Sequence, residues 1–344
     1  KKAVVAFAVV GVVAWLGYRV MLGTTAGQDF LLDRALEIIV LPVEEALPDG
    51  LQVFVCGSSS PLPDRTRAQA CIMVQAGKQV FVVDAGAGSP LVLQLGQAPL
   101  QHLKGVLLTH FHSDHISALG DLNLISWIAG RAHPLQVFGG PGVETVVAGF
   151  NQAYSLDSGY RWAHHGKDLL PPDLAVMQPQ RIEMGEFYAQ DGLRITATAV
   201  DHTPVEPAIA YRFDYLGRSV VISGDTVVAQ SLEALSENVD LLLHDALSER
   251  LVTGLASSLR AAGRNRPAQI LTDVLDAHAH TAEVQSMAER SGARLLALYH
   301  MVPPPQNILF EQILRRDLSD DVVITHDGMR FYLPAGGDII EVID

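Results

Sequence analysis

The sequence predicts a single layered α/β domain over residues 51–344, preceded by a different kind of segment. Short apolar runs recur along this part of the chain, and each stops at a polar or glycine-rich corner, as strands buried on both faces do. Segments of helical periodicity lie between several of these runs. The sequence shows no repeat of fixed period and no change in amino-acid composition that would indicate a second domain. The 344 residues are 49% hydrophobic, which provides for a sizeable core.

The predicted elements follow from these runs in chain order. The predicted strands are 51–56, 71–74, 79–84, 105–109, 135–138, 194–200, 219–223, 239–244, 294–300 and 322–325. Apolar residues at helical spacing predict helices between them, notably over 115–130, 143–154, 228–237, 267–275, 281–291 and 306–316.

The first fifty residues differ from this domain. Residues 3–23 are an apolar stretch of nearly bilayer length behind Lys1 and Lys2, and they predict a transmembrane anchor. The lysines favour a cytoplasmic amino terminus, so we expect a single-pass inner-membrane protein whose main domain is periplasmic or otherwise extracytoplasmic. A cleaved signal segment, which would leave a secreted protein, is the alternative. Residues 24–50 predict an amphipathic linker that begins with a short helix.

Charge and cysteine content exclude some classes of function. Acidic residues outnumber basic ones by 38 to 24, which gives a formal charge of −14. Such a protein repels a polyanion unless a local patch or bound cations reverse its field, so nucleic acid is a less favoured partner. The only cysteines, Cys56 and Cys71, cannot form a thiolate-rich metal site. They stand next to two predicted strands, and a disulfide or two buried thiols are both open.

Side chains that ligate metals stand just past the ends of predicted strands. Strand ends on one rim of an α/β sheet converge in space, so we expect these side chains to form one polynuclear site. The strand-end residues are Asp84, His110, His202, Asp225, His244, Asp245 and His300.

The densest corner is the array H-x-H-x-D-H at residues 110–115. In an extended turn, His110 and His112 can share one ion, while Asp114 and His115 reach a second ion from the start of the next helix. A ligand set of nitrogen and oxygen atoms favours zinc, with manganese or iron as alternatives. Two ions roughly 3.5–4 Å apart can polarise an ester oxygen and share a hydroxide at neutral pH.

These motifs resemble those of the metallo-β-lactamase superfamily, in the branch that contains tRNase Z and the arylsulfatase-like and phosphodiesterase-like hydrolases. The resemblance runs from about Val53 to Pro303 and includes the opening corner 56–63, which is followed by a typical arginine, Arg65 or Arg67. It implies an αββα sandwich, in which two mixed sheets are flanked by helices. Homodimers are common in that family, so the resemblance leaves a homodimer open.

The resemblance also implies a role for each ligand-type residue. It implies two zinc ions per chain, Asp225 as the bridge between them, and a hydroxide between the ions as the nucleophile. Asp84 would orient the metal-binding loop, and the bridging carboxylate argues against a true β-lactamase. The implied ligands are His110, His112 and His202 for the first ion, and Asp114, which is also counted as catalytic, His115 and His300 for the second.

Two further motifs concern proton transfer. His280 lies in His280-Thr281-Ala282, which resembles the H-S-T motif of tRNase Z-like enzymes and implies that His280 protonates the leaving group. Asp245 lies in a segment that resembles their H-E-A-T motif, with Asp in place of Glu and Leu in place of Thr. At close approach Asp245 would orient His280. The remaining unassigned histidines, expected to be surface or structural residues, are His102, His133, His278 and His326.

A segment between the second and third motifs passes over the site in this fold. Here it is residues 154–166, and its aromatic and imidazole side chains either line a substrate pocket or pack as a surface loop. The residues in question are Tyr160, Trp162, His164 and His165.

The substrate expected from these features is a small phosphodiester or sulfate ester. tRNase Z binds tRNA through a basic, glycine- and proline-rich arm, and no comparable insertion lies between His115 and His202. A tRNA 3′-processing endoribonuclease is the alternative. Hydrolysis of a lactone or β-lactam, or an inactive metal-binding module, ranks behind both.

Overall fold

The computed structural model describes residues 14–39 and 49–344. The chain divides into two units, residues 1–47 and residues 48–344. In the first unit, helix α2 spans Thr25–Ile39, in the segment where the sequence predicts a short helix. The rest of the predicted linker, over 40–48, lies outside the described residues.

The predicted membrane anchor is contradicted. No helix within 14–39 and 49–344 is long and apolar enough to cross a bilayer. The described helical residues of the predicted anchor are 14–23, which are followed by a bend at Thr24. Residues 3–13 of the prediction lie outside the described part, and the expected inner-membrane location is corrected accordingly.

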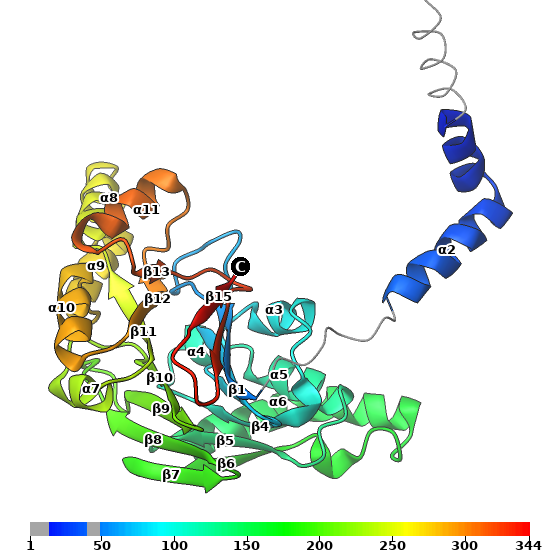
Figure 1. The fold of residues 1–344 in the computed structure, drawn as a ribbon, viewed down its shortest axis with the longest axis horizontal. Coiled ribbons are helices and arrows are strands. Elements are labelled where there is room, and N and C mark those ends of the chain that lie inside the picture. Colours follow the sequence, from blue (N-terminus) through cyan, green and yellow to red (C-terminus); the bar gives the residue numbers. More distant parts are fainter. Residues whose placement is uncertain (1–13, 40–48) are drawn as a thin grey trace, which may run out of the picture. The chain divides into compact units, whose positions relative to one another are not determined.

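The second unit is built from two sheets that lie face to face, with helices on both outer faces (Figure 1). The first sheet has the strand order β15-β14-β1-β2-β3-β4-β5-β6, and the second has the order β13-β12-β11-β10-β9-β8-β7. The strands of the first sheet are β1 (Gly50–Gly57), β2 (Cys71–Ala76), β3 (Gln79–Val83), β4 (Leu103–Leu107), β5 (Leu135–Gly139), β6 (Met177–Arg181), β14 (Arg330–Pro334) and β15 (Glu341–Ile343). Those of the second are β7 (Gly185–Gln190), β8 (Leu193–Ala199), β9 (Ile209–Tyr215), β10 (Arg218–Ile222), β11 (Leu241–Leu247), β12 (Leu295–Val302) and β13 (Val323–Ile324).

The helices form the outer layers. Those packed on the first sheet are α3 (Ser89–Leu95), α5 (Leu119–Ile128) and α6 (Val143–His165), and the short α4 (Ser113–Ile116) lies in the loop after β4. Those on the side of the second sheet are α7 (Gln230–Leu235), α8 (Glu249–Ala261), α9 (Asn265–Asp273), α10 (Thr281–Ser291) and α11 (Ile308–Leu314), with the single turn η4 (Arg315–Asp317) after α11. The predicted αββα sandwich is confirmed for this unit.

Burial on both faces explains the continuous apolar runs of the sequence. Successive side chains of a strand point to opposite faces. In β1, Val53 and Val55 therefore pack between the sheets, while Phe54 and Cys56 pack against the helix layer. Cys56 and Cys71 form a disulfide that joins the end of β1 to the start of β2.

Five strands lack such a run and escape the sequence criterion. The edge strands β6, β7 and β15 have exposed or half-buried residues along most of their length. In β9, Arg212 and Asp214 alternate with buried residues, so a strict two-residue period replaces the apolar run. The strand β14 begins at Arg330 and ends at Pro334, and only the three residues between them are buried.

Candidate metal centre

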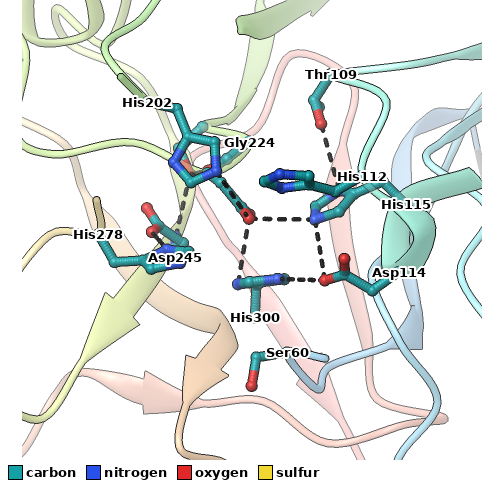
Figure 2. A network of polar contacts seen from close by, with 12 residues as sticks. Ser60, Thr109, His112, Asp114, His115, His202, Gly224, Asp245, His278 and His300 are labelled. Atoms are coloured by element: carbon teal, nitrogen blue, oxygen red, sulfur yellow. Dashed lines mark hydrogen bonds and ion pairs between the residues drawn. The ribbon is translucent and has the colours of Figure 1, made fainter. Parts of the chain in front are cut away.

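The ligand-type residues gather where strands of the two sheets end. In the first sheet β3, β4 and β5 run parallel, and in the second β10, β11 and β12 do. The carboxyl ends of parallel strands meet at one rim, so residues that follow different strands come together there. Figure 2 shows His112, His115, His202 and His300 pointing toward one another, with Asp114 beside His115 and His300. Of these residues, His300 lies within β12.

The described residues include two four-residue groups that could hold metal ions, and the groups share Asp225. Within each group the possible ligand atoms all lie within 4.8 Å of one another. The first group is His110, His112, His202 and Asp225, and the second is Asp114, His115, Asp225 and His300.

Distances around Asp225 show why it is the shared member. Its Oδ2 lies 3.2 Å from Nε2 of His115, 3.8 Å from Nε2 of His110 and 3.9 Å from Nε2 of His202. Its Oδ1 lies 3.3 Å from Nδ1 of His300. One carboxylate therefore faces histidines of both groups.

The donor set fits metal ions. Buried polar atoms in proteins nearly always have a hydrogen-bond partner. Among the described residues, however, Nε2 of His115 and His202, Nδ1 of His300 and Oδ1 of Asp225 are buried without one. The three imidazole nitrogens lie at ion-pair distances from the Asp225 carboxylate. Imidazole nitrogens with carboxylate oxygens are the ligands that zinc takes in sites without thiolate.

Asp84 holds the metal-binding loop without belonging to either group. It follows β3 in a left-handed conformation with φ 59°. Its Oδ1 accepts a hydrogen bond from the backbone N–H of Thr109 at 2.8 Å, and its Oδ2 accepts from the Thr109 hydroxyl and from Nδ1 of His115, both also at 2.8 Å. The bond to Nδ1 leaves Nε2 of His115 free to face the second group.

Electrostatics keep the buried carboxylates ionised. Burial alone would raise the pKa of Asp114, but the neighbouring imidazoles of His115 and His300 lower it below its usual range. Burial opposes ionisation of Asp225 too, and His115 and His300 nevertheless hold its pKa well below normal. Burial and the neighbouring His115 lower the pKa of His110, which favours the neutral imidazole that a metal requires.

His278, and not His280, adjoins the metal groups. Its Nδ1 donates to Oδ2 of Asp245 at 2.9 Å, and its ring lies 5.2 Å from that of His202 and 5.4 Å from that of His300. The ring of His280 instead donates from Nε2 to the carbonyl of Leu275 at 2.9 Å. The sequence predicts that Asp245 approaches His280, but the histidine that contacts Asp245 is His278, two residues earlier in the chain.

Backbone pairing is the reason for this shift. The N–H of Leu247, at the end of β11, donates to the carbonyl of Ala279 at 2.8 Å, and Leu247 forms a parallel bridge with His280. This register brings His278 level with Asp245, two residues before Leu247. The sequence holds two histidines within three residues, and no local signal distinguishes the one that the pairing turns toward the metal groups.

The segment 154–166 is helical over most of its length, because α6 continues to His165. Trp162 packs with Trp127 and Leu170 in a satellite apolar cluster, and the Nζ of Lys167 lies 4.7 Å from the centre of its ring. The segment is helix and not a surface loop, and Trp162 packs in the way that the surface alternative expects. The role of Tyr160, His164 and His165 in a substrate pocket stays a prediction.

Of the two candidate arginines in the opening corner, Arg67 is fixed by the fold. Its Nη1 donates to the Ser58 hydroxyl at 2.8 Å and to the carbonyl of Thr325. Asp327 accepts from the N–H and hydroxyl of Ser58 and from the N–H of Ala68. These bonds pin the loop 57–70 against the segment after β13, whereas Arg65 is exposed.

The two facing sheets carry a buried cluster of histidine and aspartate side chains on their common rim. This combination of fold and site is that of a metal-dependent hydrolase. A family model described as the metallo-β-lactamase superfamily matches residues 64–272. The chain belongs to this superfamily.

Relatives at the sequence level carry one name. The chain is 35% identical over 286 residues to a ribonuclease Z of Mycobacterium bovis, which covers 80% of this chain and 96% of that relative. It is 37% identical over 259 residues to a ribonuclease Z of Mycobacterium marinum, which covers 74% of this chain and 87% of the relative.

Solved structures share the fold at lower identity. The metallo-β-lactamase fold protein YhfI of Bacillus subtilis aligns with a TM-score of 0.57 at 19% identity, covering 83% of this chain and 100% of that one. The short form of human tRNase Z aligns with a TM-score of 0.56 at 17% identity, covering 81% and 98%.

Proposed function

We propose that this metallohydrolase is an endoribonuclease of the ribonuclease Z type, which uses two zinc ions to cleave a phosphodiester bond at the 3′ end of precursor tRNA. The observation that carries the proposal is the similarity to ribonuclease Z over 96% of the Mycobacterium bovis relative. This choice reverses the order that the sequence alone favours, in which a small phosphodiester or sulfate ester comes first.

The two ligand groups support a pair of ions. His110, His112 and His202 would hold the first, and Asp114, His115 and His300 the second, with Asp225 between them. Ions so placed supply a water that ionises near neutral pH and a positive charge for the phosphate oxygens. The protein contributes their positions, through the hydrogen bond from His115 to Asp84.

His278 is the residue that we assign as proton donor to the leaving oxygen, in place of His280. It is buried beside His202 and His300, so a substrate held there would meet its ring. Burial alone would lower its pKa, but the hydrogen bond to Asp245 and the charge of Asp225 raise it. Asp245 therefore favours the protonated imidazole that a general acid needs.

A second candidate substrate is a small phosphodiester or sulfate ester. The observations that favour it are the charge of −14 and the absence of a basic, flexible insertion between His115 and His202. In that interval the structure has the helix α6 and short strands, and the stretch 167–181 has only Lys167 and Arg181 as cations.

A substrate panel tests the proposal. Zinc-loaded protein would be assayed on precursor tRNA, bis(p-nitrophenyl) phosphate and p-nitrophenyl sulfate, with His112→Ala as the inactive control. We expect tRNA cleaved at one 3′ position, and turnover lost in the variant. Turnover of bis(p-nitrophenyl) phosphate without tRNA cleavage would favour the small phosphodiester, and sulfate-only turnover the sulfate ester. Bound zinc without any turnover would refute hydrolysis.

A further inference from the structure

A cleft lies beside the metal centre, between the starts of α8 and α10 and the turn η4. Its volume is about 350 Å³. The side chains that line it and matter here are Glu249, Arg250, Thr253, His280, Glu283 and Asp317. None of the metal ligands is among its lining residues, so the cleft is separate from the centre itself.

Backbone register places this cleft next to the proton donor. The segment 278–280 runs parallel to the end of β11, with Leu247 bridged to His280. His278 contacts Asp245 before that bridge, and Nδ1 of His280 lies 3.6 Å from Oε2 of Glu249 beyond it. Two residues of extended chain span about 6.5 Å. The cleft, which His280 lines, is therefore one such step along the chain from His278, and neither His278 nor a metal ligand lines it.

We infer that the cleft binds the nucleoside part of the leaving group. This inference rests on the proposed function, in which His278 protonates the leaving oxygen. In the reaction the oxygen of water bonds to phosphorus, the bond from phosphorus to the leaving oxygen breaks, and the proton goes to that oxygen. The group attached to the leaving oxygen then lies on the His278 side, where the cleft provides space.

The lining chemistry fits a ribose and a base. The carboxylates of Glu249 and Glu283 are acceptors for ribose hydroxyl groups, in the way that acidic residues bind ribose in nucleotide sites. The planar guanidinium of Arg250 can stack on a base, and Thr253 supplies a donor and an acceptor. His280, which the sequence places in a catalytic role, here becomes part of the wall of the nucleoside site.

A second groove adjoins the cleft at Arg250. It shares Arg250 and adds Arg316 and Phe310, between α8 and α11. Cations for a phosphate and an aromatic ring for a base are the features of single-strand binding surfaces. The second groove thus offers a place for a further nucleotide beside the cleft.

The test compares two substrates and a binding measurement. We would measure kcat/KM of the zinc-loaded full chain on the dinucleotide ApA and on bis(p-nitrophenyl) phosphate, and the affinity for free adenosine by calorimetry. In Glu249→Gln and in Arg250→Gln we expect the ratio of the two kcat/KM values, ApA over the nitrophenyl ester, to fall about tenfold, since each hydrogen bond or stack contributes roughly 1.4 kcal/mol. We expect adenosine binding to weaken at least threefold.

Arg260→Gln is the matched control, because Arg260 lies on the same helix and does not line the cleft. It should leave the ratio and the adenosine affinity unchanged. Adenosine that fails to bind the wild type, or that binds the cleft variants as well as the control, would overturn the inference. Adenosine binding that depends on Glu249 in a protein without phosphodiester turnover would refute the proposed function and leave the nucleoside site standing.

Discussion

Oδ2 of Asp245 accepts a hydrogen bond from Nδ1 of His278 at 2.9 Å, and the His278 ring stacks on that of His300 at 5.4 Å with an interplanar angle of 24°. The carboxylate fixes the orientation of the imidazole, and the stack places its other edge toward the metal groups. Burial would raise the pKa of Asp245, but the adjacent imidazole of His244 and the hydrogen bond from His278 lower it, so the carboxylate is ionised where it supports His278.

His278→Gln should lower kcat on ApA by about 10²- to 10⁴-fold, the usual contribution of a general acid. The loss on bis(p-nitrophenyl) phosphate should be much smaller, because p-nitrophenolate leaves without a proton. The measurement is kcat for each substrate, and His280→Gln is the comparison, with less than a tenfold loss of kcat expected on ApA. Equal losses on both substrates in His278→Gln would argue against proton donation.

Asp225→Asn should remove more metal than Asp114→Asn, because Asp225 faces histidines of both groups and Asp114 belongs to one. Elemental analysis after dialysis should give two zinc ions per wild-type chain, one in Asp114→Asn and fewer than one in Asp225→Asn. Asp214→Asn, which changes a half-buried carboxylate paired with Arg212, should retain two. A full complement of zinc in Asp225→Asn would contradict a shared ligand.

Asp84→Asn should weaken zinc binding by about 10- to 100-fold, as changes to groups that orient metal ligands do. Both carboxylate oxygens accept hydrogen bonds, and an amide would turn an NH₂ group toward one of these donors. Competition with a chelator measures the affinity. An unchanged affinity would mean that Thr109 and His115 keep their positions without Asp84.

The buried carboxylate of Asp240, which pairs with the buried Arg218 and the exposed Arg294, predicts acid sensitivity. Burial would raise the pKa of Asp240, but bonds from Arg218 and Ser219 lower it. A carboxyl group whose folded pKa lies below its unfolded value of about 3.9 stabilises the protein above that pH and loses this contribution as pH falls through the folded pKa. Asp240→Asn should cost about 3–5 kcal/mol at pH 7.

Urea unfolding measures this effect. Between pH 5 and pH 3 the free energy of unfolding should fall less steeply in Asp240→Asn than in the wild type. Asp214→Asn again serves as the control, with the wild-type slope. If Asp240→Asn is as stable as the wild type at pH 7, the ion pairs of Asp240 with Arg218 and Arg294 do not contribute to the free energy of unfolding.

Removal of the disulfide should destabilise the fold without disturbing the metal ligands. Cys56 and Cys71 are 15 residues apart, and a loop of that length predicts a loss of about 3 kcal/mol. The double variant Cys56→Ala, Cys71→Ala would be compared with the wild type in chemical denaturation, with zinc content as the control. Stability equal to that of the oxidised wild type would contradict a stabilising role.

The sequence predicts the strands that are buried on both faces, because their apolar runs need no partner to be recognised. It does not indicate edge strands such as β6 and β7, whose exposed positions are polar. The predicted membrane anchor is contradicted, because no helix among residues 14–39 and 49–344 is long and apolar enough to cross a bilayer.

What the sequence determined by itself is the family, the two-sheet architecture and the set of candidate metal ligands, because local motifs at strand ends carry them. Only the tertiary structure decided which imidazole stands beside Asp245 and which lines the neighbouring cleft. His278 and His280 have the same chemistry and nearly the same sequence context. Their surroundings differ because the parallel pairing of Leu247 with residues 279 and 280 fixes the register of this segment. That register places His278, and not His280, beside the metal groups.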